Sequence, residues 1–363
     1  MNSESKSDTT PEAVVAERYP EQPEHPIRPP YGYICYRASG PIEIDGKMDE
    51  ESWENAPWTN YFADIEGDVR PAPRYKTRVK MLWDDEYFYI AAEMEEPHVW
   101  GTLTKRDSII YMDNDFEVFI DPDGDTHLYY EIEINVLNTV WDLFLVKPYR
   151  DGAPAIYNWD INGLKHAVHV DGTLNDSSDV DKGWTVEFAI PWAVLRECAY
   201  MRTPPGEGDQ WRVNFSRVEW DHEIVDSKYE KVKNRLSNDQ TWTPQYARNI
   251  HQPERWGYVQ FTDIQAGKGE AEFVRDPDEP VRDYLMEVYY AQKRYFKANK
   301  RWAASLDDLN FKESMSMDNP TPPNGAPVKL QTTDVGFAAS MDSVCKPVVW
   351  FVNEVSRLWK VGK

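Results

Sequence analysis

The sequence contains little cysteine and no long apolar segment. Its three cysteines, Cys35, Cys198 and Cys345, are an odd number and show no C-x-x-C spacing, so neither a disulfide framework nor a cysteine zinc site is supported. No run approaches the roughly 20 apolar residues of a membrane-spanning helix, and we expect no transmembrane segment. The polar start, MNSESKSDTT, contains no signal peptide. A signal removed from the native protein would leave a similar start, so this start is only weak evidence for a cytoplasmic location. We expect a periplasmic, extracellular or cell-surface location.

Positively charged residues are also scarce. The chain has 40 Lys and Arg against 63 Asp and Glu, which gives a formal net charge of −23. Such a chain repels phosphate backbones and anionic surfaces unless a basic patch overrides the field, and the sequence contains no such patch. The composition therefore argues against nucleic acid and polyanionic glycans as partners, and it leaves neutral or cationic ligands.

Aromatic residues, in contrast, are abundant. The chain contains 15 Trp, 21 Tyr and 13 Phe. This is more tryptophan than a core of this size needs, so we expect some of the rings to be exposed for ligand contact.

The pattern along the chain predicts four parts. Residues 1–30 are rich in proline and polar side chains, which is typical of a disordered tail. Residues 31–265 consist of short alternating runs separated by turn signals, which predicts an all-β fold, an antiparallel β-sandwich of two immunoglobulin-like sheets. Residues 266–281 have the composition of a linker. Residues 282–363 predict a small C-terminal α+β extension, made of one helix and a β-hairpin.

The segment DFEVFIDPDGDTHLYYEIEIN is the most informative for function. Side chains alternate between the two faces of a strand, so each half of this segment has an apolar face and a polar face. If the DPDGD turn pairs the two halves, their polar residues share one face of the sheet. The residues expected there are Glu117, Glu131, Glu133 and Asn135, with Tyr111 and Trp141 at the margins.

Carboxylates and amides beside exposed rings suit a neutral sugar, because its hydroxyls need polar partners and its C–H faces stack on aromatic rings. The alternative interpretation is a solvated outer face, which any antiparallel sheet of a sandwich has. The pattern alone leaves both open.

Six segments, in order, resemble the successive strands of carbohydrate-binding module family 9 and its DOMON-like relatives. They are IEIDGKMDEESWENAPW, VKMLWDDEYFYIAAEM, DFEVFIDPDGDTHLYYEIEIN, GWTVEFAIPW, WRVNFSRVEW and HQPERWGYVQFTD. The resemblance implies a β-sandwich that holds a sugar ring between two aromatic side chains and fixes it with polar groups on the sheet. It also implies an association with enzymes that act on polysaccharides.

The resemblance implies roles for several residues. Tyr111 occupies the position of one of the two stacking tryptophans, Glu117 matches an acidic acceptor for sugar hydroxyls, and Asn135 matches an asparagine in the next strand. Glu133 departs from the family pattern, since sugar-binding members carry arginine there. This departure removes a donor and adds a negative charge.

Three further residues are candidates for the ligand site. Trp242, in the loop before HQPERWG, is the best candidate for the second stacking ring, and Trp159 is the reserve. Arg217 is expected to modulate binding, on condition that its neighbours Asn214 and Ser216 face away from the cleft.

The turn DPDGD places Asp121, Asp123 and Asp125 at alternate positions, a spacing that gathers oxygen ligands for calcium. The resembling family binds structural calcium. A hairpin turn with acidic caps is the simpler interpretation and the one we favour.

Two other functions remain open. Glu117 with Glu131 or Glu133 could form the paired carboxylates of a glycoside hydrolase, and some DOMON-like relatives bind haem. No G-x-S-x-G or H-E-x-x-H motif is present. We therefore favour non-catalytic carbohydrate binding in support of polysaccharide catabolism. The expected partners are a neutral oligosaccharide or polysaccharide and glycoside hydrolases.

Overall fold

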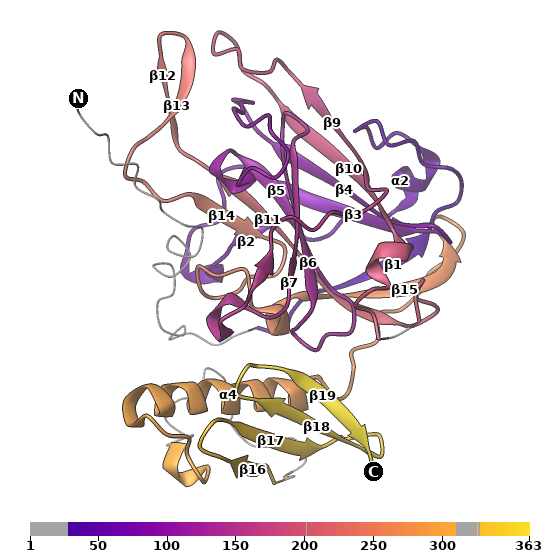
Figure 1. The fold of residues 1–363 in the computed structure, drawn as a ribbon. Helices are drawn as coiled ribbons and strands as arrows, with labels where there is room; N and C mark the ends of the chain where they lie inside the picture. Colours follow the sequence, from indigo (N-terminus) through magenta and orange to yellow (C-terminus); the bar gives the residue numbers. More distant parts are fainter. Residues whose placement is uncertain (1–27, 201, 310–324, 326) are drawn as a thin grey trace, which may run out of the picture.

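The computed structural model describes residues 28–200, 202–309, 325 and 327–363 of the chain. Most of the predicted tail, residues 1–30, lies outside the described residues. The described chain forms a large β-sandwich and a smaller C-terminal unit (Figure 1). Among the described residues, no helix is long and apolar enough to cross a membrane.

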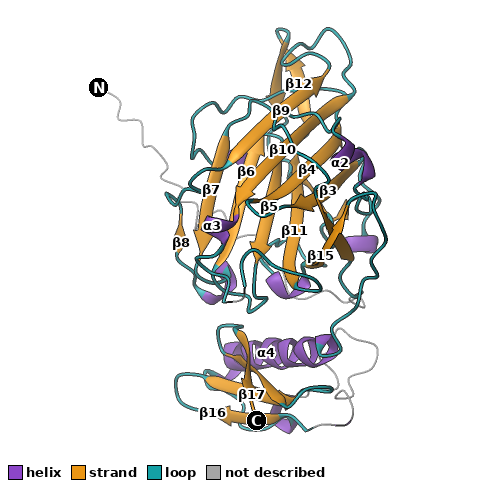
Figure 2. Ribbon diagram, turned by 90° about the vertical axis from the view of Figure 1, so that its right-hand side faces the viewer, coloured by secondary structure: helices purple, strands orange, loops and turns teal. Residues whose placement is uncertain are grey.

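One continuous sheet makes up the sandwich and bends over so that its two halves pack face to face (Figure 2). Its strands, in sheet order, are β8 (Ala155–Ile156), β7 (Val140–Leu145), β6 (Tyr129–Asn135), β5 (Asp115–Asp121), β11 (Gln210–Glu219), β15 (Gly257–Gln265), β1 (Gly32–Arg37), β3 (Thr77–Trp83), β4 (Tyr87–Glu95), β10 (Gly183–Pro191) and β9 (Lys165–Asp171). The remaining strands of the sandwich are β14 (Asn238–Thr241), which pairs with β11, β2 (Ala63–Asp64), which pairs with β14, and the hairpin of β12 (His222–Val225) and β13 (Lys228–Lys231). The sandwich also has two short α-helices, α2 (Glu51–Asn55) and α3 (Trp192–Leu195), and several 3-10 helices.

The core between the two halves follows from the alternation in the strands. Phe116, Val118 and Ile120 of β5 are buried in it, as the pattern predicts. Phe116 stacks on Phe188 of the opposite half, with ring centroids 6.4 Å apart. The predicted all-β sandwich is confirmed. One feature differs from a purely antiparallel sheet, because β1 pairs in parallel with both β15 and β3.

The C-terminal unit consists of helix α4 (Glu279–Asn299) and a four-stranded antiparallel sheet of β16 (Lys329–Thr332), β17 (Phe337–Asp342), β18 (Val348–Asn353) and β19 (Leu358–Gly362). This sheet has two more strands than the expected hairpin. Leu285 and Val288 of α4 pack on Phe337 and Val352 of the sheet. The helix lies between this sheet and the sandwich in both views (Figures 1 and 2).

A buried carboxylate, Asp151, joins the C-terminal unit to the sandwich. It accepts hydrogen bonds from the hydroxyls of Tyr289 and Ser356, both at 2.7 Å, and from the ammonium group of Lys293 at 2.9 Å. Asp151 belongs to the 3-10 helix η3 (Tyr149–Asp151), which follows β7. The same short helix therefore contacts α4 and, as described below, supplies a wall of the candidate site.

Candidate functional site

The antiparallel pairing of β5 and β6 brings acidic residues together on the outer face of the sandwich. Glu117 pairs directly with Glu133, and Phe119 pairs with Glu131. On its other side, Glu117 pairs with Ser216 of β11. The predicted pairing through the DPDGD turn and the predicted placement of these glutamates on one face are therefore confirmed.

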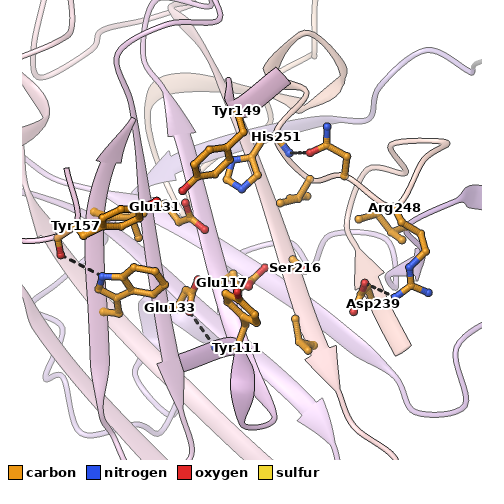
Figure 3. A pocket seen from close by; sticks show the side chains of 16 residues that line it. Tyr111, Glu117, Glu131, Glu133, Tyr149, Tyr157, Ser216, Asp239, Arg248 and His251 are labelled. Atoms are coloured by element: carbon orange, nitrogen blue, oxygen red, sulfur yellow. Dashed lines mark hydrogen bonds and ion pairs between the residues drawn. The ribbon is translucent and has the colours of Figure 1, made fainter. Parts of the chain in front are cut away.

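A cavity lies over this acidic row (Figure 3). Its volume is about 90 Å³. Its lining includes Tyr111, Glu117, Glu131, Glu133, Trp141, Tyr149, Tyr157, Ser216, Asp239, Arg248, Asn249 and His251. The cavity thus combines a carboxylate floor with aromatic and polar walls, which is the composition of a site for a small polar ligand.

Aromatic side chains form two walls of the cavity. Trp141 and Tyr157 stack with centroids 5.8 Å apart, and the indole N–H of Trp141 donates to the carbonyl oxygen of Tyr157 at 3.2 Å. Tyr149 meets the ring of His251 edge-on at 4.6 Å. Tyr111 lies across from Tyr149 in Figure 3, beside Glu117 and Glu133. These contacts hold the rings in place without a ligand.

The carboxyl groups at the floor of the cavity have strongly raised pKa values. Burial, followed by repulsion from Glu117, raises the pKa of both Glu131 and Glu133 well above the ordinary value. Asp115, two residues before Glu117 on β5, has a raised pKa for the same two reasons. The backbone N–H of Tyr111 donates to Oε2 of Glu133 at 2.9 Å and partly offsets this effect. Oxygen atoms of Asp115, Glu117 and Glu133 lie within 4.8 Å of one another.

The described residues that line the cavity include one arginine and one histidine. Arg248 forms an ion pair with Asp239 at 2.8 Å, and it also donates to the carbonyl oxygen of Ser237 at 2.9 Å. Burial, with repulsion from Arg150, lowers the pKa of His251 to about 3, so its ring is neutral at physiological pH. Among the described residues that line the cavity, Arg248 is therefore the only side chain with a permanent positive charge.

Of the residues expected at the site, the structure brings Tyr111, Glu117 and Glu133 together in the cavity. Asn135 lies on the same strand but does not line it. Its amide donates to the carbonyl oxygen of Leu103 at 2.8 Å and to the carboxylate of Asp113 at 3.0 Å. Asn135 therefore fixes a neighbouring loop.

Both predicted tryptophans lie outside the cavity. Trp242 is 1% exposed and packs in the core against Tyr33 and Phe215. Its ring covers Gly257 so closely that a Cβ there would lie 2.3 Å from it. Trp159 packs against Tyr130 at the edge of the same core. Both were expected to stack on a ligand, and we remove both from the candidate site because their rings face the interior.

Arg217 is also removed from the candidate site. Ser216 faces the cavity, so alternation along β11 turns Arg217 to the interior. There it is 1% exposed and forms an ion pair with Glu96. The condition placed on its role, that Ser216 face away from the cleft, is not met.

Several lining residues were missed by the sequence analysis. Tyr149 and Tyr157 come from the chain that follows β7, and Arg248, Asn249 and His251 come from the segment between β14 and β15. These segments have no periodicity from which a direction could be read. The segment RNIHQ, directly before the PERWG block, was the available signal, because polar residues next to a strand of a binding sheet often serve the ligand.

The acidic turn between β5 and β6 forms a second cluster. Oxygens of Asp121, Asp123 and Asp125 lie within 4.8 Å of one another. Both oxygens of Asp121 accept backbone N–H groups, from Gly124 and Thr126, at 2.9 Å. Burial and repulsion from Asp125 raise the pKa of Asp123 to about 6. Three converging carboxylates fit the oxygen-ligand preference of calcium, and Arg357, 3.0 Å from Asp125, supplies one positive charge at the turn.

Comparison with known proteins places this fold and site in context. Residues 44–263 match the model of the family described as carbohydrate family 9 binding domain-like. The chain is 26% identical over 154 residues to "Exoglucanase XynX" of Acetivibrio thermocellus and 26% identical over 152 residues to "Endo-1,4-beta-xylanase A" of Thermoanaerobacterium saccharolyticum. Each match covers 42% of this chain, and it spans 12% and 11% of the two relatives, respectively.

Among solved structures, a carbohydrate binding module family 9 from Caldicellulosiruptor kristjanssonii in complex with cellotriose aligns with 15% identity and a TM-score of 0.41. The alignment covers 67% of this chain and 100% of that one. Because the family model spans more than half of the sequence, the chain belongs to the carbohydrate family 9 binding domain-like family.

Proposed function

We propose that the cavity over β5 and β6 binds a sugar unit without cleaving it. The observation that carries the proposal is the meeting of Glu117 and Glu133 with the ring of Tyr111 in one cavity on the outer sheet face. Glu117 accepts hydrogen bonds from sugar hydroxyls, and Tyr111 stacks on a C–H face of the ring. Membership of the family supports the same assignment.

Trp141, Tyr149 and Tyr157 take over the role that was expected of Trp242. All three line the cavity, and Tyr149 and Tyr157 lie on sides of it away from Tyr111 in Figure 3, so a ring bound above the glutamates contacts aromatic surface on more than one side. We propose further that binding serves polysaccharide catabolism, because the two curated relatives are named as an exoglucanase and a xylanase.

The test is calorimetric titration of the purified chain with glucose, xylose, cellotriose and xylotriose. Saturable binding that Glu117→Gln and Tyr111→Ala abolish, and that Tyr111→Phe retains, supports the proposal. Reducing-sugar release during a long incubation would show hydrolysis and contradict it. Absence of binding to the whole panel by a folded protein would also contradict it.

We also propose that calcium stabilises the acidic turn of Asp121, Asp123 and Asp125. The support is the convergence of their oxygens and the repulsion that raises the pKa of Asp123. A divalent cation bound there would relieve this repulsion. Thermal unfolding measured with added Ca²⁺ and with a chelator tests the proposal. We expect a higher midpoint with Ca²⁺ that Asp123→Asn removes, and equal midpoints would overturn the proposal.

A further inference from the structure

The C-terminal unit packs against the segments that carry one wall of the cavity, the rings of Tyr149 and His251. We propose that this unit belongs to the ligand site and that Tyr290 of α4 is a positioning residue for this wall. Docking of the unit and sugar binding therefore strengthen each other. This inference rests on the proposed function and adds to it a second structural unit that sets the affinity of the same site.

Arg150 connects the two segments that form the wall. It follows Tyr149 directly in η3, and its side chain is 12% exposed. Its guanidinium group donates to both carboxylate oxygens of Glu254, at 3.0 and 2.9 Å. It also donates to the carbonyl oxygen of His251 at 3.4 Å. Arg150 thus ties the turn that carries Tyr149 to the segment that carries His251.

Helix α4 reaches this connection through one hydroxyl group. The hydroxyl of Tyr290 donates to the carboxylate of Glu254 and accepts from Arg150 at 3.2 Å. It also lies 3.2 Å from Oε1 of Gln252. The amide of Gln252 donates to the carbonyl oxygen of Asn249 at 3.1 Å, and Asn249 lines the cavity. A single hydroxyl of the C-terminal unit therefore contacts both segments that hold the wall.

The Arg150–Glu254 pair makes this connection stiff. The side chain of Glu254 is 5% exposed. Burial raises its pKa, but the charge of Arg150 outweighs burial and lowers the pKa overall, so the carboxylate is ionised at neutral pH. A bidentate pair of arginine and carboxylate fixes orientation as well as distance. Loss of the Tyr290 hydroxyl takes a donor from this buried carboxylate, so the pair must move to find a new arrangement.

A movement of the pair changes the cavity itself. The rings of Tyr149 and His251 meet edge-on with centroids 4.6 Å apart, and Nδ1 of His251 lies 3.0 Å from the hydroxyl of Tyr129 (Figure 3). The cavity that they line measures about 90 Å³. Groups that bind a ligand must be held within about 0.5 Å of the productive geometry, so a small shift of this wall lowers the affinity for a sugar ring.

A second set of contacts acts on the same short helix. Asp151 of η3 accepts hydrogen bonds from three side chains of the C-terminal unit, namely Tyr289, Lys293 and Ser356. Two successive residues of η3 are therefore held by the unit, Arg150 through Tyr290 and Asp151 through the other three. By linkage, a ligand that binds more tightly when the unit is docked must also favour the docked state, by the same factor.

The experiment compares Tyr290→Phe with the parent by calorimetric titration with glucose, xylose, cellotriose and xylotriose. We expect the dissociation constant of each sugar that binds the parent to rise about fivefold, the lower end of the usual coupling between two sites. Arg150→Lys keeps the charge but lacks the planar fork that grips the carboxylate, and it should weaken binding as well. Circular dichroism checks the fold of each variant.

The matched control is Tyr295→Phe, which removes a hydroxyl from the same helix. Tyr295 packs through its ring, against the core of the C-terminal unit and under the guanidinium group of Arg301. Its variant should bind sugar as the parent does. A weakening by Tyr295→Phe equal to that of Tyr290→Phe would overturn the inference, because the loss would then follow from any change in the helix.

A second readout separates positioning from stability. A saturating sugar should slow proteolysis of residues 266–278 in the parent by at least the same factor of about five, and it should protect Tyr290→Phe less. A merely structural role of Tyr290 would lower the unfolding midpoint without changing either the dissociation constant or this protection.

The outcomes are distinguishable. Dissociation constants that Tyr290→Phe and Arg150→Lys leave unchanged overturn the inference and leave the proposed function standing. Equal proteolysis with and without a bound sugar also overturns the inference alone. Failure of the folded parent to bind every sugar of the panel overturns the proposed function itself, and the inference with it.

Discussion

Arg217 and Glu96 form an ion pair inside the sandwich, with Nη2 of Arg217 2.8 Å from Oε2 of Glu96 and the two side chains 1% and 3% exposed. Arg217 also donates to the hydroxyl of Thr77 at 3.2 Å. Burial raises the pKa of Glu96, and the charge of Arg217 opposes that shift. The pair therefore holds two charges in the interior that neither side chain could keep alone.

Removal of Arg217 should destabilise the fold and leave the ligand site intact. Arg217→Met leaves the Glu96 carboxylate buried and unpaired, which costs about 3–5 kcal/mol in comparable cases. Denaturant unfolding measures this loss, and the double variant Arg217→Met/Glu96→Gln should recover part of it. Lys182→Met, which breaks the exposed Lys182–Asp171 pair, is the control and should have little effect. If Arg217→Met and Lys182→Met lost the same unfolding free energy, the prediction would be contradicted.

Substitution of Tyr111 should weaken sugar binding, whereas substitution of Trp242 should lower the stability of the fold. Tyr111→Ala removes a half-buried ring from the cavity wall, so we expect sugar affinity to fall at least tenfold with little change in unfolding free energy. Trp242→Ala empties a core position and should cost about 3–5 kcal/mol. Calorimetry and denaturant unfolding of both variants provide the check. A stable Trp242→Ala protein that fails to bind sugar would return Trp242 to the site.

The acidic floor should make stability depend on pH. The pKa of Glu133 is raised in the folded state, so its contribution is fully present below the unfolded value of 4.5 and is lost as the pH rises through the folded pKa. We therefore expect Glu133→Gln to gain stability relative to the parent as the pH rises from about 4.5 to 8. Urea unfolding at several pH values measures the difference. A constant difference between the two proteins over that range would refute this expectation.

His251 should behave in the opposite sense. Its pKa is lowered to about 3 in the folded state, so the unfolded chain takes up a proton first as the pH falls below 6.5. The stability contribution of the neutral ring is present above pH 6.5 and declines between pH 6.5 and about 3. Proton NMR of the imidazole should show a neutral ring at pH 5. Titration of His251 with a midpoint near 6.5 would disprove this assignment.

Asp151 should hold the C-terminal unit on the sandwich. Burial raises its pKa, but Arg150 and Lys293 outweigh this effect, so the pKa is lowered overall and the carboxylate is ionised at neutral pH. Asp151→Ala leaves the donors of Tyr289, Lys293 and Ser356 without their acceptor. Limited proteolysis should then cut residues 266–278 at least tenfold faster than in the parent. Asp342→Ala, which breaks an exposed pair with Lys363, is the control.

The strand patterns predicted more of this site than the loops did. Alternation in β5 and β6 was enough to place Glu117 and Glu133 on one face, because a strand has only two faces. Alternation also applies to Arg217 on β11, but it does not tell which face of β11 lines the cleft, and the role of Arg217 depended on that face. Its partner Glu96 lies far away in the sequence, and no local pattern indicates such a pair.

The abundance of tryptophan led us to choose Trp242 as the second stacking ring, and this choice was wrong. Trp242 follows β14 in a segment without alternation, and its direction is set by contact with Phe215 and Gly257 rather than by its neighbours. Tyr149 and Tyr157 reach the cavity through turns after β7 that only the folded chain defines. The number of aromatic residues led us to expect rings at a candidate ligand site, whereas the tertiary structure was required to show which rings line the cavity.

The parallel pairing of β1 with β15 also affects how the chain folds. These two strands are the first and last of the sandwich, and Gly32 pairs with Tyr258. Because β15 lies between β1 and β11 in the sheet, these two strands each keep an unpaired edge until the chain has been synthesised through β15. We expect slow folding limited by this long-range closure, and a protein truncated before residue 257 should expose sheet edges and aggregate.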